Sequence, residues 1–315
     1  MTILYKYMPI ISNYLKNPTI KLSPPALLND PFESKNARHI SDFIYDKYRD
    51  EYQGSLINGK RLTEARAKTI IKNAPKRTIN LSGIFSLSES NRSLLMWAHY
   101  ADQHKGMVIG IEDDFLDNDI DTSIPTRLIN TKRPIKVNYD TVRFDSSEFD
   151  FTKAHINVVT RQLALKVLTT KSDDWLYEKE HRFILPIALA DKIKYTGESM
   201  NFGYRLRTAI KRGELEIDLD TKLVSIHEDT PMTDNLYQHM SSNKDFLFLK
   251  NINPKKIKSI YFGVRADDYM IKEYLDDIEN NKEELGHIKL YNYTLCDERF
   301  SLIRDDLDEE DYELL

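Results

Sequence analysis

The chain divides into short apolar runs, several with an apolar residue at every second position, and longer stretches in which apolar residues recur every three or four positions. The first pattern is typical of strands and the second of amphipathic helices. Expected strands are 3–8, 19–23, 82–88, 107–111, 132–139, 175–187, 257–262 and 287–295; expected helices are 36–53, 62–71, 94–103, 154–169, 200–211 and 269–279. Because the two kinds do not alternate regularly, we predict an α+β fold: short, mostly antiparallel strands in one or two small sheets, with helical insertions packed around a central cleft.

The same pattern predicts one domain over residues 1–304. The polar stretch 113–126 is expected to be a surface excursion within it rather than a linker, and the helices at about 36–73 an insertion that covers a face. Residues 305–315 contain seven acidic residues. Such a run of like charge is typical of a solvated segment, so we predict a flexible acidic tail.

The stretch 175–187, Trp-Leu-Tyr-Glu-Lys-Glu-His-Arg-Phe-Ile-Leu-Pro-Ile, places charges among residues of a buried type. In an extended strand Glu178, Glu180 and Arg182 would share one face. Burying such charges is costly unless they are paired, solvated or used. The stretch is therefore the first candidate for chemistry, and a structural ion pair between Glu180 and Arg182 is the alternative interpretation.

Capping residues and turn residues locate two further candidate segments. Asn91 or Ser93 is expected to begin the helix 94–103, on which His99 and Asp102 are neighbours because they are three residues apart. The loop Asn-Asp-Pro-Phe-Glu at 29–33 is an ordered turn whose acids either cap it or take part in function. Asp267 or Asp268 is expected to cap the helix 269–279.

Composition narrows the class of protein. A chain of 315 residues with 41% hydrophobic content can bury a sizeable core. The single cysteine, Cys296, excludes an internal disulfide and fits a reducing compartment, so the expected location is the cytoplasm. No apolar run reaches membrane-spanning length. The net charge of −5 becomes about +2 without the seven acids of the tail, so a strong nucleic-acid footprint is not expected.

Four motifs together resemble a large bacterial family catalogued as domain of unknown function 2971. They are Leu-Tyr-Lys-Tyr at 4–7; Leu-Ser-Pro-Pro at 22–25 with 29–33; Ser-Leu-Ser at 86–88 with Met-Trp-Ala-His-Tyr-Ala-Asp at 96–102 and His-Lys-Gly at 104–106; and Trp175 with Tyr-Glu-Lys-Glu-His-Arg at 177–182. The resemblance spans most of the chain, and it implies no particular activity.

More distantly, the chain is similar to ADP-ribosyltransferase-like folds, which split NAD in a cleft between two small sheets. That resemblance implies NAD as a substrate and a late glutamate, here Glu180 or Glu178, as the catalytic carboxylate, with Arg182 and Tyr100 beside it. The residues expected to bind NAD are Tyr5, Tyr7, Ser86, Ser88, His99, Asn29 and Asp30. A protein or nucleic acid would be the target of modification, and a toxin-like effector in bacterial antiphage defence is one setting for such an enzyme.

The chemistry gives a reason for a carboxylate at this position. Cleavage of the bond between nicotinamide and ribose builds positive charge on the sugar, which a carboxylate stabilises. An NAD-consuming transferase or glycohydrolase is therefore the leading hypothesis. A non-enzymatic module that binds a ligand or partner protein is the second, and a metal-dependent nuclease using Asp102, His99, Glu178 and Glu180 is the third. For the leading hypothesis no bound metal is expected.

Overall fold

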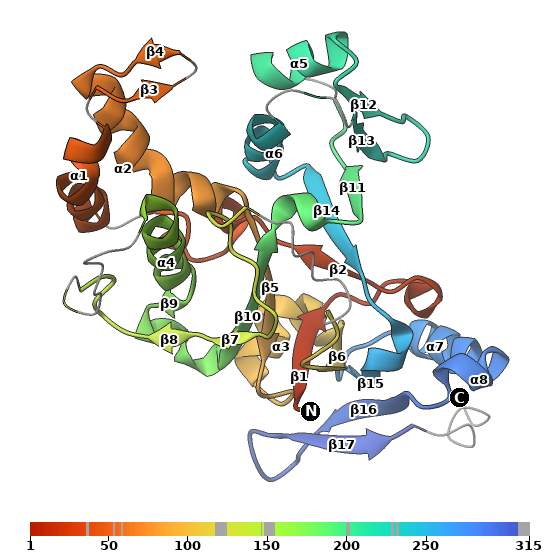
Figure 1. Cartoon of the computed structure of the whole chain (residues 1–315). Helices are drawn as coiled ribbons and strands as arrows, with labels where there is room; N and C mark the ends of the chain where they lie inside the picture. Colours follow the sequence, from red (N-terminus) through yellow and green to blue (C-terminus); the bar gives the residue numbers. More distant parts are fainter. Residues whose placement is uncertain are drawn as a thin grey trace.

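The computed structural model describes residues 1–35, 38–52, 54–57, 59–116, 125–145, 147, 155–199, 202–227, 230 and 233–307. Helices and strands occur together, and most strand pairs are antiparallel, which confirms the α+β class (Figure 1). Among the helices of these residues, none combines the length and the apolar character needed to cross a membrane. The acidic residues 308–315 of the expected tail lie outside the described residues, whereas Asp305 and Asp306 belong to a strand.

The described residues form one eight-stranded sheet with the order β17-β16-β15-β6-β1-β5-β10-β7. Every neighbouring pair is antiparallel except β15 and β16. The strands are β1 (Ile3–Met8), β5 (Ser82–Ser88), β6 (Met107–Glu112), β7 (Ile135–Lys136), β10 (Glu180–Pro186), β15 (Ile257–Phe262), β16 (Lys289–Leu295) and β17 (Leu302–Asp306). The strand β7 directly follows Pro134 and lies at one edge of the sheet, the position in which a sheet tolerates a proline.

Smaller sheets surround the large one. A three-stranded sheet has the order β11-β14-β2, and a bridge between Ser23 and Ile84 ties it to β5. The remaining strands pair two by two, β3 with β4, β8 with β9 and β12 with β13. Their bounds are β2 (Thr19–Leu22), β3 (Leu56–Ile57), β4 (Lys60–Arg61), β8 (Asn138–Tyr139), β9 (Thr170–Lys171), β11 (Lys192–Tyr195), β12 (Leu215–Ile217), β13 (Val224–Ile226) and β14 (Phe246–Asn251).

The large sheet opens between β1 and β5. The strand β1 pairs with β6 along its whole length, and β5 pairs with β10 along its whole length, but β1 meets β5 only at Tyr5 and Ser88. Beyond that pair the two strands diverge, so their backbone groups no longer close the sheet. Farther along β5 the bridge from Ser23 takes the place of β1, and a cavity lies between β1 and β5.

The helices cover the sheet unevenly. Apolar residues of α1, α2 and α4 form one cluster with Ile84 of β5 and Ile184 of β10, so the expected insertion packs over these two strands. The α-helices are α1 (Arg38–Tyr52), α2 (Glu64–Asn80), α3 (Leu94–Tyr100), α4 (Ile156–Leu168), α5 (Tyr204–Lys211), α6 (Thr233–Ser241), α7 (Asp268–Asn280) and α8 (Lys282–Leu285). Short 3₁₀ helices span Tyr14–Lys16, Pro25–Leu27, Asp102–His104, Asp173–Glu178, Ile187–Leu189 and Pro254–Lys256.

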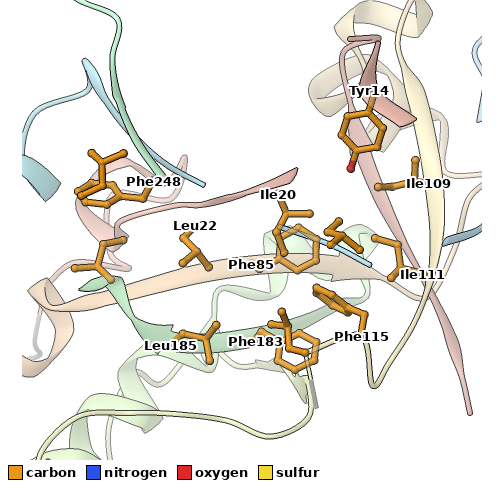
Figure 2. Close-up of a cluster of buried hydrophobic side chains, with 14 of the residues drawn as sticks. Tyr14, Ile20, Leu22, Phe85, Ile109, Ile111, Phe115, Phe183, Leu185 and Phe248 are labelled. Carbon is orange, nitrogen blue, oxygen red and sulfur yellow. The ribbon is translucent and has the colours of Figure 1, made fainter. Parts of the chain in front are cut away.

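The largest hydrophobic cluster lies beneath the sheet and joins it to the three-stranded sheet. Phe85 and Phe183, neighbours on β5 and β10, both pack near Phe115 (Figure 2), with ring centroids 5.4 and 5.0 Å from that of Phe115. Leu22 of β2 and Phe248 of β14 belong to the same cluster. Burial on this scale stabilises each large side chain by about 2 kcal/mol. The strands that border the gap are therefore held firmly.

Several sequence-based boundaries were wrong. The helix expected at 62–71 is α2, which continues to Asn80, and the strand expected at 132–139 is two short strands, β7 and β8, in different sheets. The strand expected at 175–187 begins only at Glu180, because Ser172 caps a 3₁₀ helix over Asp173–Glu178 and Lys179 follows with a φ of 46°. The helix expected at 94–103 ends at Tyr100, because positive φ values from Asp102 to His104 cannot continue an α-helix. The expected cap of α7 is confirmed, since the Asp267 side chain accepts the Tyr269 N–H.

Candidate functional site

A polar cavity of about 340 Å³ lies where β1 and β5 diverge. Its described walls come from β1, β2 and the loop after it, β5, α3 and the segment from β9 to β10, and none comes from residues 36–73. All of the site residues predicted from the sequence except Asp30 line it: Tyr5, Tyr7, Asn29, Ser86, Ser88, His99, Tyr100, Glu178, Glu180 and Arg182. The fold thus brings residues from distant parts of the chain to one place.

Glu180 and Arg182 form a two-point ion pair at the base of the cavity. The Arg182 Nε and Nη2 atoms donate to Glu180 Oε1 and Oε2, each at 2.7 Å, and Nη1 donates to the Leu168 carbonyl at 2.8 Å. Arg182 is only 1% exposed. A guanidinium buried this deeply needs all of these acceptors, and bidentate pairs of this kind hold both side chains rigidly.

Two further residues extend the ion pair into a buried network. Glu33, from the loop after β2, accepts from Arg182 Nη2 at 2.7 Å through Oε1, while its Oε2 has no hydrogen-bond partner. The Lys171 Nζ lies 2.6 Å from Glu178 Oε2, 3.3 Å from Glu33 Oε1 and 3.5 Å from Glu180 Oε2. The network therefore places two cations among three carboxylates, with one negative charge in excess.

Glu178 is the carboxylate that Tyr100 contacts. The Tyr100 hydroxyl donates to Glu178 Oε1 at 2.5 Å, so of the two glutamates expected beside Tyr100 it is Glu178, rather than the first-named Glu180, that binds it. The left-handed conformation of Lys179 explains this outcome, because it turns the chain between the two glutamates. Glu178 and Glu180 therefore reach the same cavity from a 3₁₀ helix and a strand, rather than as alternate residues of one strand.

The two glutamates have opposite electrostatic environments. Burial alone would raise the pKa of Glu180, but the charges of Arg182 and Lys171, with hydrogen bonds from Arg182 and Ser86, lower it to about 2. For Glu178 burial dominates, and the neighbouring charge of Glu180 adds to it, so its pKa is raised despite Lys171 and Tyr100. Glu180 is therefore held in its ionised form, whereas the raised pKa of Glu178 means that it binds a proton at higher pH than an ordinary glutamate does.

The other predicted residues divide into structural and accessible ones. The Tyr7 hydroxyl donates to the Ser90 carbonyl at 2.9 Å, and the Ser88 hydroxyl donates to the Glu178 carbonyl at 2.7 Å, so both hold the cavity wall. His99 and Asn29 are exposed at the cavity, and the Asn29 side chain hydrogen-bonds Tyr100. Tyr5 is half-buried, with its ring 6.0 Å from that of Tyr261.

Asp30 lies outside the cavity. Its Oδ1 accepts the Phe32 N–H at 2.8 Å, so it caps the turn, as one of the two interpretations of this loop expected. It faces a neighbouring cavity of about 350 Å³ whose wall also includes Lys171. The structure therefore separates Asp30 from the residues with which it was grouped.

The cavity also contains three lysines that the sequence did not single out: Lys6, Lys21 and Lys171. Lys6 Nζ donates to the Ser86 carbonyl at 3.1 Å and lies 5.0 Å from the centre of the Phe85 ring. Burial lowers the pKa of Lys6 to about 8, and the charge of Lys21 adds to that effect. A lysine between two tyrosines in the first predicted strand was the available signal, because lysine is rarely buried unless its ammonium has a partner.

Replacing Lys6 by methionine should stabilise the protein at pH 7, by about 1 kcal/mol or more, because it removes a desolvated ammonium. The unfolded chain binds the Lys6 proton more tightly than the folded one, since the folded pKa is about 8 and the ordinary value 10.5. The wild type therefore regains stability relative to the variant as the pH rises from 8 to 10.5. Urea unfolding at several pH values measures this, with exposed Lys105→Met as the control.

The geometry of a metal site was also compared with the structure. Asp102 is not on the helix that carries His99, because α3 ends at Tyr100. Within the described part of the chain, no group of three or more His, Cys, Asp or Glu side chains is placed to hold a metal ion. The geometry therefore does not supply the four-residue site that the nuclease hypothesis requires.

Comparison with known proteins adds one finding. Residues 96–183 match the model of a family described as a protein of unknown function (DUF2971). The matched segment runs from α3 to β10 and includes Tyr100, Lys171, Glu178, Glu180 and Arg182. No curated protein and no solved structure matches the chain. These comparisons do not support the more distant resemblance to ADP-ribosyltransferases, so NAD chemistry is taken up only as a proposal.

Proposed function

We propose that the cavity between β1 and β5 is the active site of an enzyme that cleaves the nicotinamide–ribose bond of NAD. One observation carries the proposal: Glu178, a buried carboxyl group with a raised pKa, lies at the cavity wall with Tyr100 at 2.5 Å and Lys171 at 2.6 Å. Carboxyl groups with perturbed pKa values in concave polar sites are frequent in catalysis.

The reaction breaks the bond between C1′ of the ribose and N1 of the nicotinamide ring. The bonding electrons leave with nicotinamide, which becomes neutral, and C1′ becomes an oxocarbenium-like centre. Water or an acceptor group on a protein or nucleic acid then adds to C1′ and loses a proton. The ionised Glu178 stabilises the developing positive charge, and electrostatic stabilisation of this kind is commonly the largest single contribution to catalysis.

Glu180 has a supporting part in this proposal. The oxygens of both glutamates are bound, but Arg182 lowers the pKa of Glu180 to about 2, whereas the pKa of Glu178 is raised, so Glu180 is the poorer partner for a proton. Its fixed negative charge helps to raise the pKa of Glu178. Glu180 is thus a positioning residue, and Glu178 is the proposed catalytic carboxylate.

The remaining walls supply groups suited to the rest of NAD. Tyr5, Tyr100 and His99 present aromatic rings at the cavity, and such rings can stack against nicotinamide. Lys6 and Lys21 place two ammonium groups in the same cavity, where a diphosphate could accept hydrogen bonds from them. The volume of about 340 Å³ holds part of NAD, so the remainder would extend past the exposed Asn29 and His99.

The proposal is tested by incubating purified protein with NAD and measuring the release of nicotinamide. We expect the rate to rise with pH through the raised pKa of Glu178, because only its ionised form stabilises the transition state. Labelled NAD with cell extract shows whether the ribosyl group passes to a macromolecule. The proposal is wrong if nicotinamide is not released and no macromolecule is labelled at any pH at which the protein is folded.

A ligand-binding module without catalysis is the second candidate, favoured by the internal partners that Glu178 and Glu180 already have. A site in which both carboxylates are satisfied can bind a ligand without reacting with it. Calorimetric titration distinguishes the two candidates. A binding module would bind NAD beside Lys6 and Tyr5, and the NAD recovered afterwards would not be cleaved.

A further inference from the structure

The helices α2, α4 and α6, whose positions Figure 1 shows, line a second candidate binding cavity, of about 510 Å³. It shares no described lining residue with the cavity between β1 and β5. The helices α2 and α4 pack against each other, and the Ser241 hydroxyl of α6 donates to the carbonyl of Asn80, the last residue of α2, at 3.1 Å. All three helices contribute polar side chains to its lining, among them Asn73 of α2, Thr160 of α4 and Gln238 of α6, although packed helices ordinarily face each other with apolar residues.

Three polar atoms at this cavity are buried without a hydrogen-bond partner: Thr160 Oγ1, Arg127 Nε and Gln238 Nε2. Thr160 is only 3% exposed, and a hydroxyl on a helix can usually reach the carbonyl one turn earlier. Unsatisfied buried groups are uncommon in native proteins, and each calls for an explanation such as a ligand. A ligand bound in this cavity would explain all three groups, which come from three different segments of the chain.

The charge of the cavity favours an anion. Lys76, Arg77 and Arg127 line it, and its described lining residues include no carboxylate. One acid, Asp234, contacts the two arginines without lining the cavity. Its Oδ2 accepts hydrogen bonds from Arg77 Nη2 at 3.0 Å and from Arg127 Nη2 at 2.7 Å. One carboxylate shared by two guanidiniums leaves positive charge in excess, and the Nε–H of Arg127 remains available to another acceptor.

The N-terminus of α4 adds to this field. The helix begins at Ile156, and the His155 ring nitrogen Nδ1 accepts the Asn157 N–H at 3.2 Å. Ile156, Asn157 and Thr160 all line the cavity, so the first turn of α4 borders it. The N-terminal end of a helix carries partial positive charge and is a common site for phosphate groups.

We propose that this second cavity binds a phosphorylated small molecule of about nucleotide size. The phosphate would accept hydrogen bonds from Arg127 Nε and lie near the first turn of α4, while the Thr160 hydroxyl and the Gln238 amide bind polar groups of the remainder. A volume of about 510 Å³ is within the usual range for small-molecule sites. A nucleotide and a sugar phosphate share this chemistry, and the test separates them.

The test measures the melting temperature of the full chain during titration with adenosine 5′-monophosphate, ribose 5-phosphate or adenosine. We expect at least one of the two phosphate-bearing probes to raise the melting temperature with concentration, and adenosine to have no such effect. A response to adenosine monophosphate alone identifies a nucleotide site, and an equal response to ribose 5-phosphate identifies a sugar phosphate site. No shift with either phosphate-bearing probe overturns the proposal.

Variants locate the bound probe. Arg127→Gln should weaken binding about 10- to 100-fold through the loss of a charge-assisted hydrogen bond. Arg212→Gln is the matched control, since Arg212 is an exposed arginine 3.7 Å from a glutamate and does not line this cavity. Lys6→Met reports on the other cavity. If Lys6→Met removes the shift and Arg127→Gln keeps it, the phosphate binds between β1 and β5, and the proposal is wrong.

Thr160→Val provides a second measurement that does not depend on charge. Because the hydroxyl has no partner in the free protein, its replacement by a methyl group should leave the melting temperature unchanged or higher, and binding of the probe should weaken several-fold. A lower melting temperature with unchanged binding would assign Thr160 a purely structural role and contradict the proposal.

Discussion

Replacing Arg182 by methionine should destabilise the protein by about 3–5 kcal/mol, because the change leaves buried carboxylates without their cation. Glu180 loses both of its 2.7 Å contacts, and Glu33 loses its closest donor. Lys171 alone then faces three carboxylates. Urea unfolding followed by circular dichroism measures the loss, and a small domain of ordinary stability would be close to unfolding after it.

A double variant separates the charge effect from lost packing. In Glu180→Gln/Arg182→Met one of the stranded carboxylates is neutral, so part of the lost stability should return. Arg212→Met, at an exposed ion pair of 3.7 Å, should change the free energy of unfolding by no more than about 0.5 kcal/mol. Equal losses in the single and double variants would show that Arg182 contributes through packing rather than through its charge.

Replacing Glu178 by glutamine should reduce nicotinamide release by about 10²- to 10³-fold, the usual cost of removing one preorganised electrostatic group. The melting temperature should change little, because Lys171 keeps Glu33 and Glu180 as partners. The rise of activity with pH that Glu178 governs should also disappear. Rates of nicotinamide release across pH, with thermal melts of the same samples, provide the comparison.

Glu180→Gln is the informative counterpart of that variant. It should lower stability more than Glu178→Gln does, because Arg182 loses one of its two charged acceptors. Glu112→Gln, in an ion pair with Lys256 outside the cavity, controls for the loss of a carboxylate in general. If Glu180→Gln abolished turnover without a change in melting temperature, and Glu178→Gln did not, the catalytic role would belong to Glu180.

Much of the candidate site could be predicted from the chain. Charges among apolar residues must be paired or used, and this rule identified Glu178, Glu180 and Arg182 as candidates. The motifs of the family resemblance supplied Ser86 and Tyr100. In the structure, residues of these motifs line one cavity. The strand pattern also predicted the α+β class, because short apolar runs such as those of β5 and β10, which are buried at nearly every position, are typical of strands.

The partners of these residues could not be predicted. Glu33 lies 149 residues from Arg182 in the chain, and no local pattern indicates that contact. Nothing in the sequence around Lys171 distinguishes it from other residues before a turn, yet its Nζ forms ion pairs with three glutamates. Contacts between distant segments depend on how the sheets close, and a single sequence contains no direct signal of that.

The sequence by itself indicated most strands of the large sheet and that charge is buried near residues 178–182, because periodicity and the cost of burying ions are local properties. It did not indicate β14, α6 or β17. Only the tertiary structure decided which glutamate faces Tyr100. That choice depends on the left-handed turn at Lys179 and on Arg182, which binds both oxygens of Glu180 and leaves Glu178 to Tyr100 and Lys171. The turn at Lys179 and the choice of Arg182 between the two glutamates depend on packing in three dimensions, and the order of residues does not reveal either one.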